Sequence, residues 1–157
     1  MRYKHWLGLG AGLVLGIIFL VAGIGKALAQ AELFETSFLN YLDFLNLDQV
    51  RLLFHGLPYV EIVIGLFLVT GFAMKLVAAF SSLLIAAFIT SNAWFIAHGM
   101  GFEPCSCLGI FSRLLHNQLS TQQSFYLDLA MLALVLVTLF CYQRRFTDIY
   151  PWFMSKE

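Results

Sequence analysis

The residues best suited to chemistry in this sequence are two cysteines, Cys105 and Cys107, which stand one residue apart in the run EPCSCLG. Thiol–disulfide exchange needs one thiolate that attacks a disulfide and a second thiol that resolves the mixed disulfide. A Cys-x-Cys pair supplies both thiols within one short segment. A disulfide between them closes a small, strained ring, and strained disulfides are typically labile or catalytic. The spacing therefore indicates redox chemistry.

Two other interpretations of the pair are open. The thiols could be inert, or they could bind a soft metal ion. A metal site needs further ligands, and the nearby histidines, His98 and His116, stand at irregular spacing. We therefore expect no metal site. The third cysteine, Cys141, lies far along a later apolar segment, and we expect it to be a packing residue.

The composition indicates that the whole chain is an integral membrane protein. Its 157 residues are 61% hydrophobic and only 11% charged, with a formal net charge of zero. Soluble domains carry about 25% charged residues. The neutral charge balance gives no reason to expect a nucleic-acid partner, and the length fits a single domain over residues 1–157.

Four apolar segments must position the cysteine pair, and each is long enough to be a membrane span. They cover about residues 7–28, 57–74, 76–97 and 126–142. The first could instead be a signal peptide, because the run ALA at its end resembles a cleavage site. Glycines at every fourth position, Gly8, Gly12 and Gly16, argue for a retained span that packs against other helices.

The connection between the first two spans has a helical pattern of its own. Apolar residues recur at helical spacing from Phe34 to Leu45, with Asn40 and Asp43 between them. We predict an amphipathic helix there, which lies on the outer membrane surface or over the mouth of the bundle. The predicted fold class is therefore all-α, an integral membrane four-helix bundle with an amphipathic outer helix between spans 1 and 2.

Basic residues predict the orientation of these spans. Four spans place both termini on one side, together with six of the nine basic residues. Those on the terminal side are Arg2, Lys4, Lys75, Arg144, Arg145 and Lys156, and those on the other side are Lys26, Arg51 and Arg113. By the positive-inside rule the termini are cytoplasmic. We therefore expect a multi-pass membrane protein with its cysteine pair on the outer side.

Three ionisable residues within the spans, Lys26, Glu61 and Asp128, are expected to meet near the outer surface, together with Asn92 and His98. Charged groups at membrane depth are costly and usually face the bundle interior. Lys26 and Glu61 either pair with each other or lie apart, with the lysine reaching outward to headgroups and the acid at a hydrated helix start. A lysine close to a cysteine would also stabilise a thiolate.

Three sequence motifs, in this order and spacing, resemble the MauE branch of the DoxX-like four-helix membrane proteins. They are FLVAGIGKAL at the end of the first span, LPYVEI at the start of the second, and CSCLG after the third. The resemblance implies a four-span bundle with a part in extracytoplasmic thiol redox chemistry beside thioredoxin-like partners. Ser106 and Leu108 replace the glycine and phenylalanine that we associate with the branch. Serine disfavours the positive backbone angles that glycine allows.

By the same resemblance, Cys105 and Cys107 match the family's Cys-x-Cys, Lys26 its first-span lysine and Glu61 its second-span acid. We predict a thiol–disulfide redox protein in which these four residues are catalytic and Asp128 helps to shape the pocket. Its partners would be the lipid bilayer and a thioredoxin-like or disulfide-bearing protein. The alternatives are a non-catalytic assembly subunit of a larger membrane complex and a quinone-linked electron-transfer protein. Quinone is thus the cofactor considered, although no cofactor is firmly implied.

Overall fold

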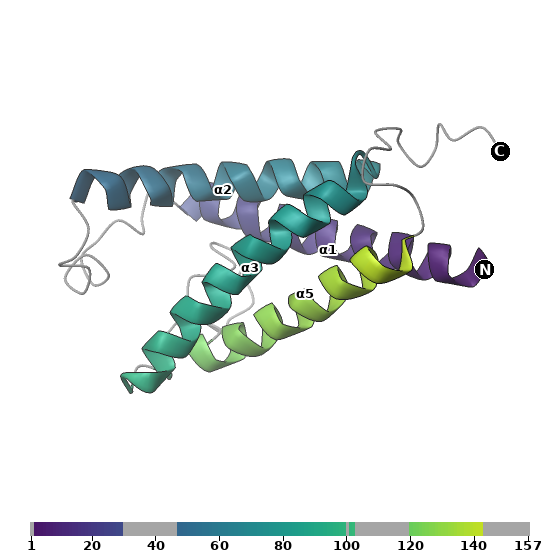
Figure 1. Ribbon diagram of the computed structural model, residues 1–157. Coiled ribbons are helices and arrows are strands. Elements are labelled where there is room, and N and C mark those ends of the chain that lie inside the picture. The colour runs from purple at the N-terminus through teal and green to yellow at the C-terminus, as the bar shows by residue number, and fades with distance from the viewer. Residues whose placement is uncertain (1, 30–46, 100, 103–119, 143–157) are drawn as a thin grey trace.

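A computed structural model describes residues 2–29, 47–99, 101–102 and 120–142 of the chain, and Figure 1 shows their arrangement. The helices within these residues are α1 (Arg2–Ala29), α2 (Leu47–Thr70), α3 (Met74–Ala97) and α5 (Thr121–Cys141). They confirm the predicted all-α membrane bundle. The predicted amphipathic pattern over residues 34–45 lies outside the described residues.

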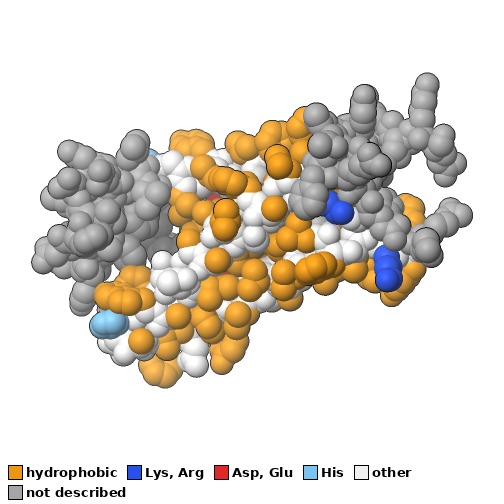
Figure 2. All heavy atoms as spheres, in the orientation of Figure 1, with side chains coloured by type: hydrophobic (Ala, Val, Ile, Leu, Met, Phe, Trp, Pro, Cys, Tyr) orange, Lys and Arg blue, Asp and Glu red, His pale blue; other side chains and the backbone are white. Residues whose placement is uncertain are grey.

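The described helices have the length and the apolar composition of helices that contact lipid. Three stretches are long and apolar enough to cross a membrane, namely Trp6–Leu28, Met74–Ala97 and Thr121–Cys141. Helix α2 contains a shorter apolar stretch, His55–Thr70. Large apolar side chains cover much of the face seen in Figure 2, and such a surface would favour aggregation in water. In a bilayer the same surface is matched to its solvent, so this is a membrane protein.

The helices form two antiparallel pairs, α1 with α2 and α3 with α5. Helix α1 also packs against α5, whereas α2 makes few contacts with α3. Figure 1 shows the two pairs converging at the end that contains the N-terminus. They diverge toward the other end, where α1 ends at Ala29, α3 ends at Ala97 and α5 begins at Thr121. We call these the converging end and the diverging end.

Glycines bring the backbones of α1 and α2 into direct contact. A Cβ atom added to Gly16 would lie 3.0 Å from the carbonyl oxygen of Gly65, and one added to Gly65 would lie 2.9 Å from that of Gly16. Seven residues along each helix, a Cβ on Gly23 would lie 2.9 Å from the carbonyl oxygen of Pro58. No side chain fits at these positions without moving a helix. Small residues let membrane helices approach this closely, which strengthens van der Waals packing.

Gly8 and Gly12, the other two of the regularly spaced glycines in α1, lie where the two helix pairs meet. Gly8 lies against the backbone of Cys141 and Tyr142, and Gly12 lies against the side chains of Met74 and Thr138. Gly8, Gly12 and Gly16 therefore pack against neighbouring helices, as predicted, and together they contact α2, α3 and α5. This packing holds the converging end together.

The joint between the pairs is a short turn at residues 71–73, slightly before the break at Lys75 that the predicted spans imply. Gly71 has a φ of 72°, and Ala73, which precedes α3, has a φ of 45°. Hydropathy does not reveal this turn, because the residues that form it are themselves mostly apolar. Its position is set by backbone conformation, which composition alone does not report.

Candidate functional site

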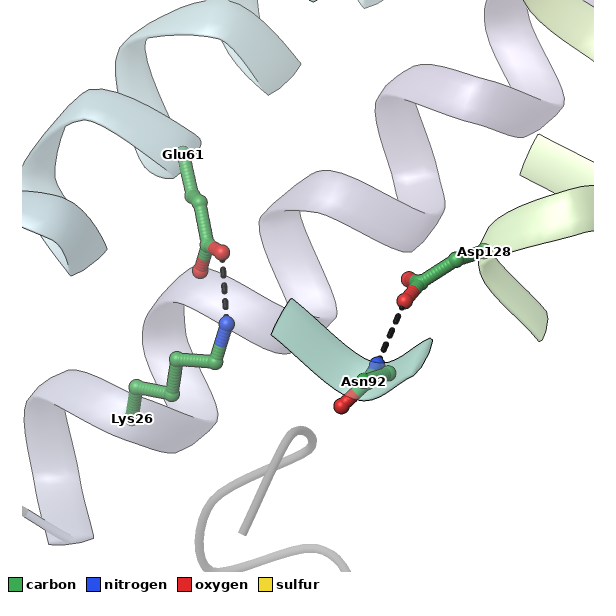
Figure 3. A network of polar contacts seen from close by, with 4 residues as sticks. All are labelled: Lys26, Glu61, Asn92 and Asp128. Atoms are coloured by element: carbon green, nitrogen blue, oxygen red, sulfur yellow. Dashed lines mark hydrogen bonds and ion pairs between the residues drawn. The ribbon is translucent and has the colours of Figure 1, made fainter. Parts of the chain in front are cut away.

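Lys26 of α1 and Glu61 of α2 form an ion pair inside the bundle, with 2.5 Å between Nζ and Oε1 (Figure 3). The side chain of Glu61 is 1% exposed and that of Lys26 is 19% exposed. In a helix the Cβ atoms lean toward the N-terminus, so a lysine near the end of α1 extends back into the bundle. Of the two alternatives for these residues, the structure therefore shows pairing, and Lys26 does not extend outward to headgroups.

Asn92 of α3 and Asp128 of α5 make the matching contact in the second helix pair. The Asn92 amide Nδ2 donates a hydrogen bond of 2.7 Å to Asp128 Oδ2, and both side chains are buried. Figure 3 shows this contact and the ion pair in one close view. The sequence predicted that these positions would lie near each other but did not pair them.

A ring from α3 joins the two contacts into one polar layer, which we define as Lys26, Glu61, Asn92 and Asp128. The Lys26 Nζ lies 5.0 Å from the centroid of Phe88, a cation–π distance. The lysine thus contacts an acid within its own helix pair and an aromatic ring of the other pair. The predicted meeting of span-end charges is confirmed for these residues.

His98, which was expected in the same region, is exposed at the end of α3 and makes other contacts. Its Nδ1 atom lies 2.8 Å from the carbonyl oxygen of Trp94, and the two rings are 4.0 Å apart. The histidine is therefore engaged with its own helix. Among the described residues, no three His, Cys, Asp or Glu side chains form a group that could hold a metal ion.

Within the described part of the chain, two buried oxygens at or near this layer have no hydrogen-bond partner. One is Oε2 of Glu61, and the other is Oγ of Ser124. Ser124 precedes Asp128 by four residues and both are buried, so they share one face of α5. Ser124 was not predicted from the sequence, although its position four residues before Asp128 on a helix indicates that the two side chains share a face.

Cys105 and Cys107 lie outside the described residues, but the residues on both sides of their segment are described. The backbone N–H of Gln122 donates a hydrogen bond of 3.1 Å to the carbonyl of Gly101. Ser120 and Gln123 form a reciprocal capping box that fixes the start of α5. Segment 103–119 therefore leaves and rejoins the described fold at the diverging end.

The polar layer lies at the same end of the bundle. All of these residues also fall within a match to a known family. The family model described as methylamine utilisation protein MauE matches residues 4–141. The chain belongs to the MauE family. The match takes in nearly all of the four described helices, the polar layer and the cysteine pair, so the family predicted from the sequence is confirmed. No curated protein and no solved structure matches the chain.

Cys141, the remaining cysteine of this MauE-family chain, is a half-buried free thiol at the converging end. About 20 Å of helix α5 separates it from Asp128 of the polar layer. It therefore lies too far away to take part in the site.

Proposed function

We propose that this MauE-family protein is a membrane-embedded thiol–disulfide redox protein that works through Cys105 and Cys107. The observation that carries the proposal is the hydrogen bond from the Gln122 N–H to the Gly101 carbonyl, which joins the described residues on either side of segment 103–119 at the end that holds the polar layer. A half-buried lysine and two buried carboxylates at that end provide charge that can influence thiol ionisation.

Chain connectivity supports this placement. Cys105 follows Phe102, the last described residue before the segment, by three positions. At the maximum reach of an extended chain, its Cα lies within about 11 Å of the Phe102 Cα. The thiol therefore cannot move far from the diverging end, where the polar layer lies.

The chemistry is thiol–disulfide exchange with a partner disulfide. The thiolate of one cysteine attacks a partner sulfur, which forms a mixed disulfide and releases the partner's other sulfur as a thiolate. The second cysteine, as a thiolate, then attacks its neighbour. This step forms the Cys105–Cys107 disulfide and releases the partner's first sulfur. Two electrons pass to the partner, and its two thiolates take up the protons that the cysteines released. The reverse sequence would oxidise the partner instead.

The proposed setting is the bacterial inner membrane, with four spans, cytoplasmic termini and the cysteine pair outside. Helix α2 would be the fourth span, with its apolar stretch His55–Thr70 in the hydrocarbon core and its more polar first turns at the headgroups. The partner would be a thioredoxin-like or disulfide-bearing extracytoplasmic protein. An oxidising compartment is where such exchange operates.

Differential alkylation in cells tests this function. In a Cys141→Ser background, Cys105 and Cys107 should change together between alkylated and protected forms after treatment with reductant or oxidant. Replacement of one of the two by serine should trap a mixed disulfide with a partner, visible as a higher-mass species that reductant removes. A pair that never changes oxidation state would rule the function out.

A second candidate, an assembly subunit of a membrane complex, is favoured by an apolar groove between α2 and α3. The groove has a volume of about 720 Å³ and is lined by residues that include Tyr59, Val63, Phe67, Phe80 and Leu83. A transmembrane helix of another subunit would fit such a surface. If Leu83→Trp abolishes a native complex while the double Cys→Ser variant retains both complex and function, this candidate replaces the first.

A further inference from the structure

The polar layer contains more acid than base among the described residues. Glu61 and Asp128 contribute two carboxylates, and Lys26 contributes one ammonium group. The groups that face the layer come from every helix, because α3 adds the neutral amide of Asn92. With all three ionised, the layer carries one uncompensated negative charge. Ionised groups at membrane depth are unfavourable unless they are paired.

The uncompensated negative charge belongs to the second helix pair, α3 and α5. Lys26 contacts Glu61 directly, so the charge of that acid is balanced within the first pair. Asp128 is held by the amide of Asn92, which donates a hydrogen bond but carries no charge. The acid without a direct cationic partner in the described part of the chain is therefore Asp128.

The unpartnered oxygens are an independent sign that the layer binds something. Ser124 Oγ lies on the Asp128 face of α5 and is fully buried without a hydrogen-bond partner. Oε2 of Glu61, from α2, is buried and unpartnered in the same way. A buried acceptor without a partner costs free energy that a bound donor or cation would recover.

We propose that the polar layer is a binding site for one additional positive charge, held chiefly by Asp128 and Ser124. The carrier is either a proton or an alkali cation, since both satisfy oxygen ligands and neutralise the layer. This site uses residues that do not include the cysteines. It therefore stands or falls independently of the redox function proposed above.

Thermal unfolding of the purified protein in lipid nanodiscs tests the site in two arms. In the first, sodium or potassium replaces choline at constant pH and ionic strength, and in the second the pH varies at constant salt. A ligand that binds only the folded state raises Tm as its concentration rises. The wild type should gain Tm with alkali cation if that is the carrier, or as pH falls if the carrier is a proton.

Variants identify the residues responsible. Asp128→Asn removes the surplus charge, so it should abolish the response seen in the wild type. Ser124→Ala keeps the charge but removes a ligand, and it should reduce the response even if Asp128→Asn fails to fold. Ser81→Ala is the matched control. It also removes a buried serine hydroxyl, but one that donates to the carbonyl of Ala78 in its own helix, and its response should equal that of the wild type.

Two results would overturn the proposal. The first is a wild-type Tm that responds to neither alkali cations nor pH. The layer would then bind no additional charge from solution. The second is a response of the same size in the wild type, Asp128→Asn and Ser124→Ala, which would place the bound charge elsewhere.

Discussion

The two helix pairs are held together by different kinds of contact. Each pair is fastened near the diverging end by one buried polar contact, between residues 35 positions apart in α1 and α2 and 36 positions apart in α3 and α5. The first contact is an ion pair between helices whose glycine backbones touch. The second joins a carboxylate to an amide, between helices that meet through larger buried side chains such as Ile85 and Val135.

This difference shows where the bundle is rigid and where it can respond. Close backbone contact leaves the α1/α2 pair no room for rearrangement, and its charges are matched. In the α3/α5 pair the helices meet through side chains that can change rotamer, and Asp128 is paired with the neutral amide of Asn92. A change in charge or ligand should therefore act on the second pair before the first.

The largest expected effect is the loss of one partner of the ion pair. Lys26→Met leaves Glu61 buried without a cation, and we expect destabilisation of about 3–5 kcal/mol. Denaturant unfolding in detergent measures it. The double variant Lys26→Met/Glu61→Met should recover most of the loss, because a matched apolar pair carries no buried charge. If the double variant is as unstable as the single one, the lysine acts through packing instead.

A smaller effect is expected from forcing the first pair apart. Gly65→Leu places a side chain where a Cβ alone would meet the backbone of Gly16, and overpacking of this kind costs about 1–3 kcal/mol. Gly10→Leu is the matched control, since nothing lies within 4 Å of a Cβ at that exposed position. Leucine is a better helix former than glycine, so an equal loss of Tm in the two variants would show that the loss does not come from the α1/α2 interface.

The second pair should be more tolerant. Asn92→Leu removes the donor to Asp128, and hydrogen bonds to charged groups contribute about 1.5–3 kcal/mol. We expect a loss toward the lower end of that range, because the side-chain interface can adjust around the acid. The measurement is the same unfolding experiment. A loss larger than that of Lys26→Met would reverse the ranking of the two pairs.

The smallest effect concerns the joint between the pairs. Ala73 adopts a left-handed conformation, which costs an L-residue roughly 1–2 kcal/mol relative to glycine. Ala73→Gly relieves that strain but increases the entropy of the unfolded chain, so we expect a net gain below about 1 kcal/mol. A rise in Tm of a few degrees would fit, and a fall would show that the Ala73 methyl group is needed in the core.

The sequence predicted the order of the helices and the residues of the polar layer, because both follow from hydropathy and from the alternation of chain direction. It was less successful at helix ends. Helix α2 begins at Leu47, ten residues before the predicted span, and includes Pro58 in its interior. Hydropathy detects the apolar part of a helix, and α2 continues beyond that part through polar residues.

The start of α5 could have been predicted more closely. Ser120 and Gln123 have the spacing of a capping box, but the predicted span began at residue 126 because the preceding glutamines are polar. The pairing of Lys26 with Glu61 was left open for a different reason. It depends on which faces of α1 and α2 meet, and no periodicity in the sequence records how the two helices are rotated against each other.

The turn at residues 71–73 has a mechanical consequence. It is the short covalent link between the two pairs, and it lies at the end where they converge. Because α3 is 24 residues long, a rotation of about 5° at this pivot would move its far tip by about 3 Å. A small angular change near Ala73 would therefore change the distance between the two helix pairs at the polar layer, where Lys26 lies against the ring of Phe88.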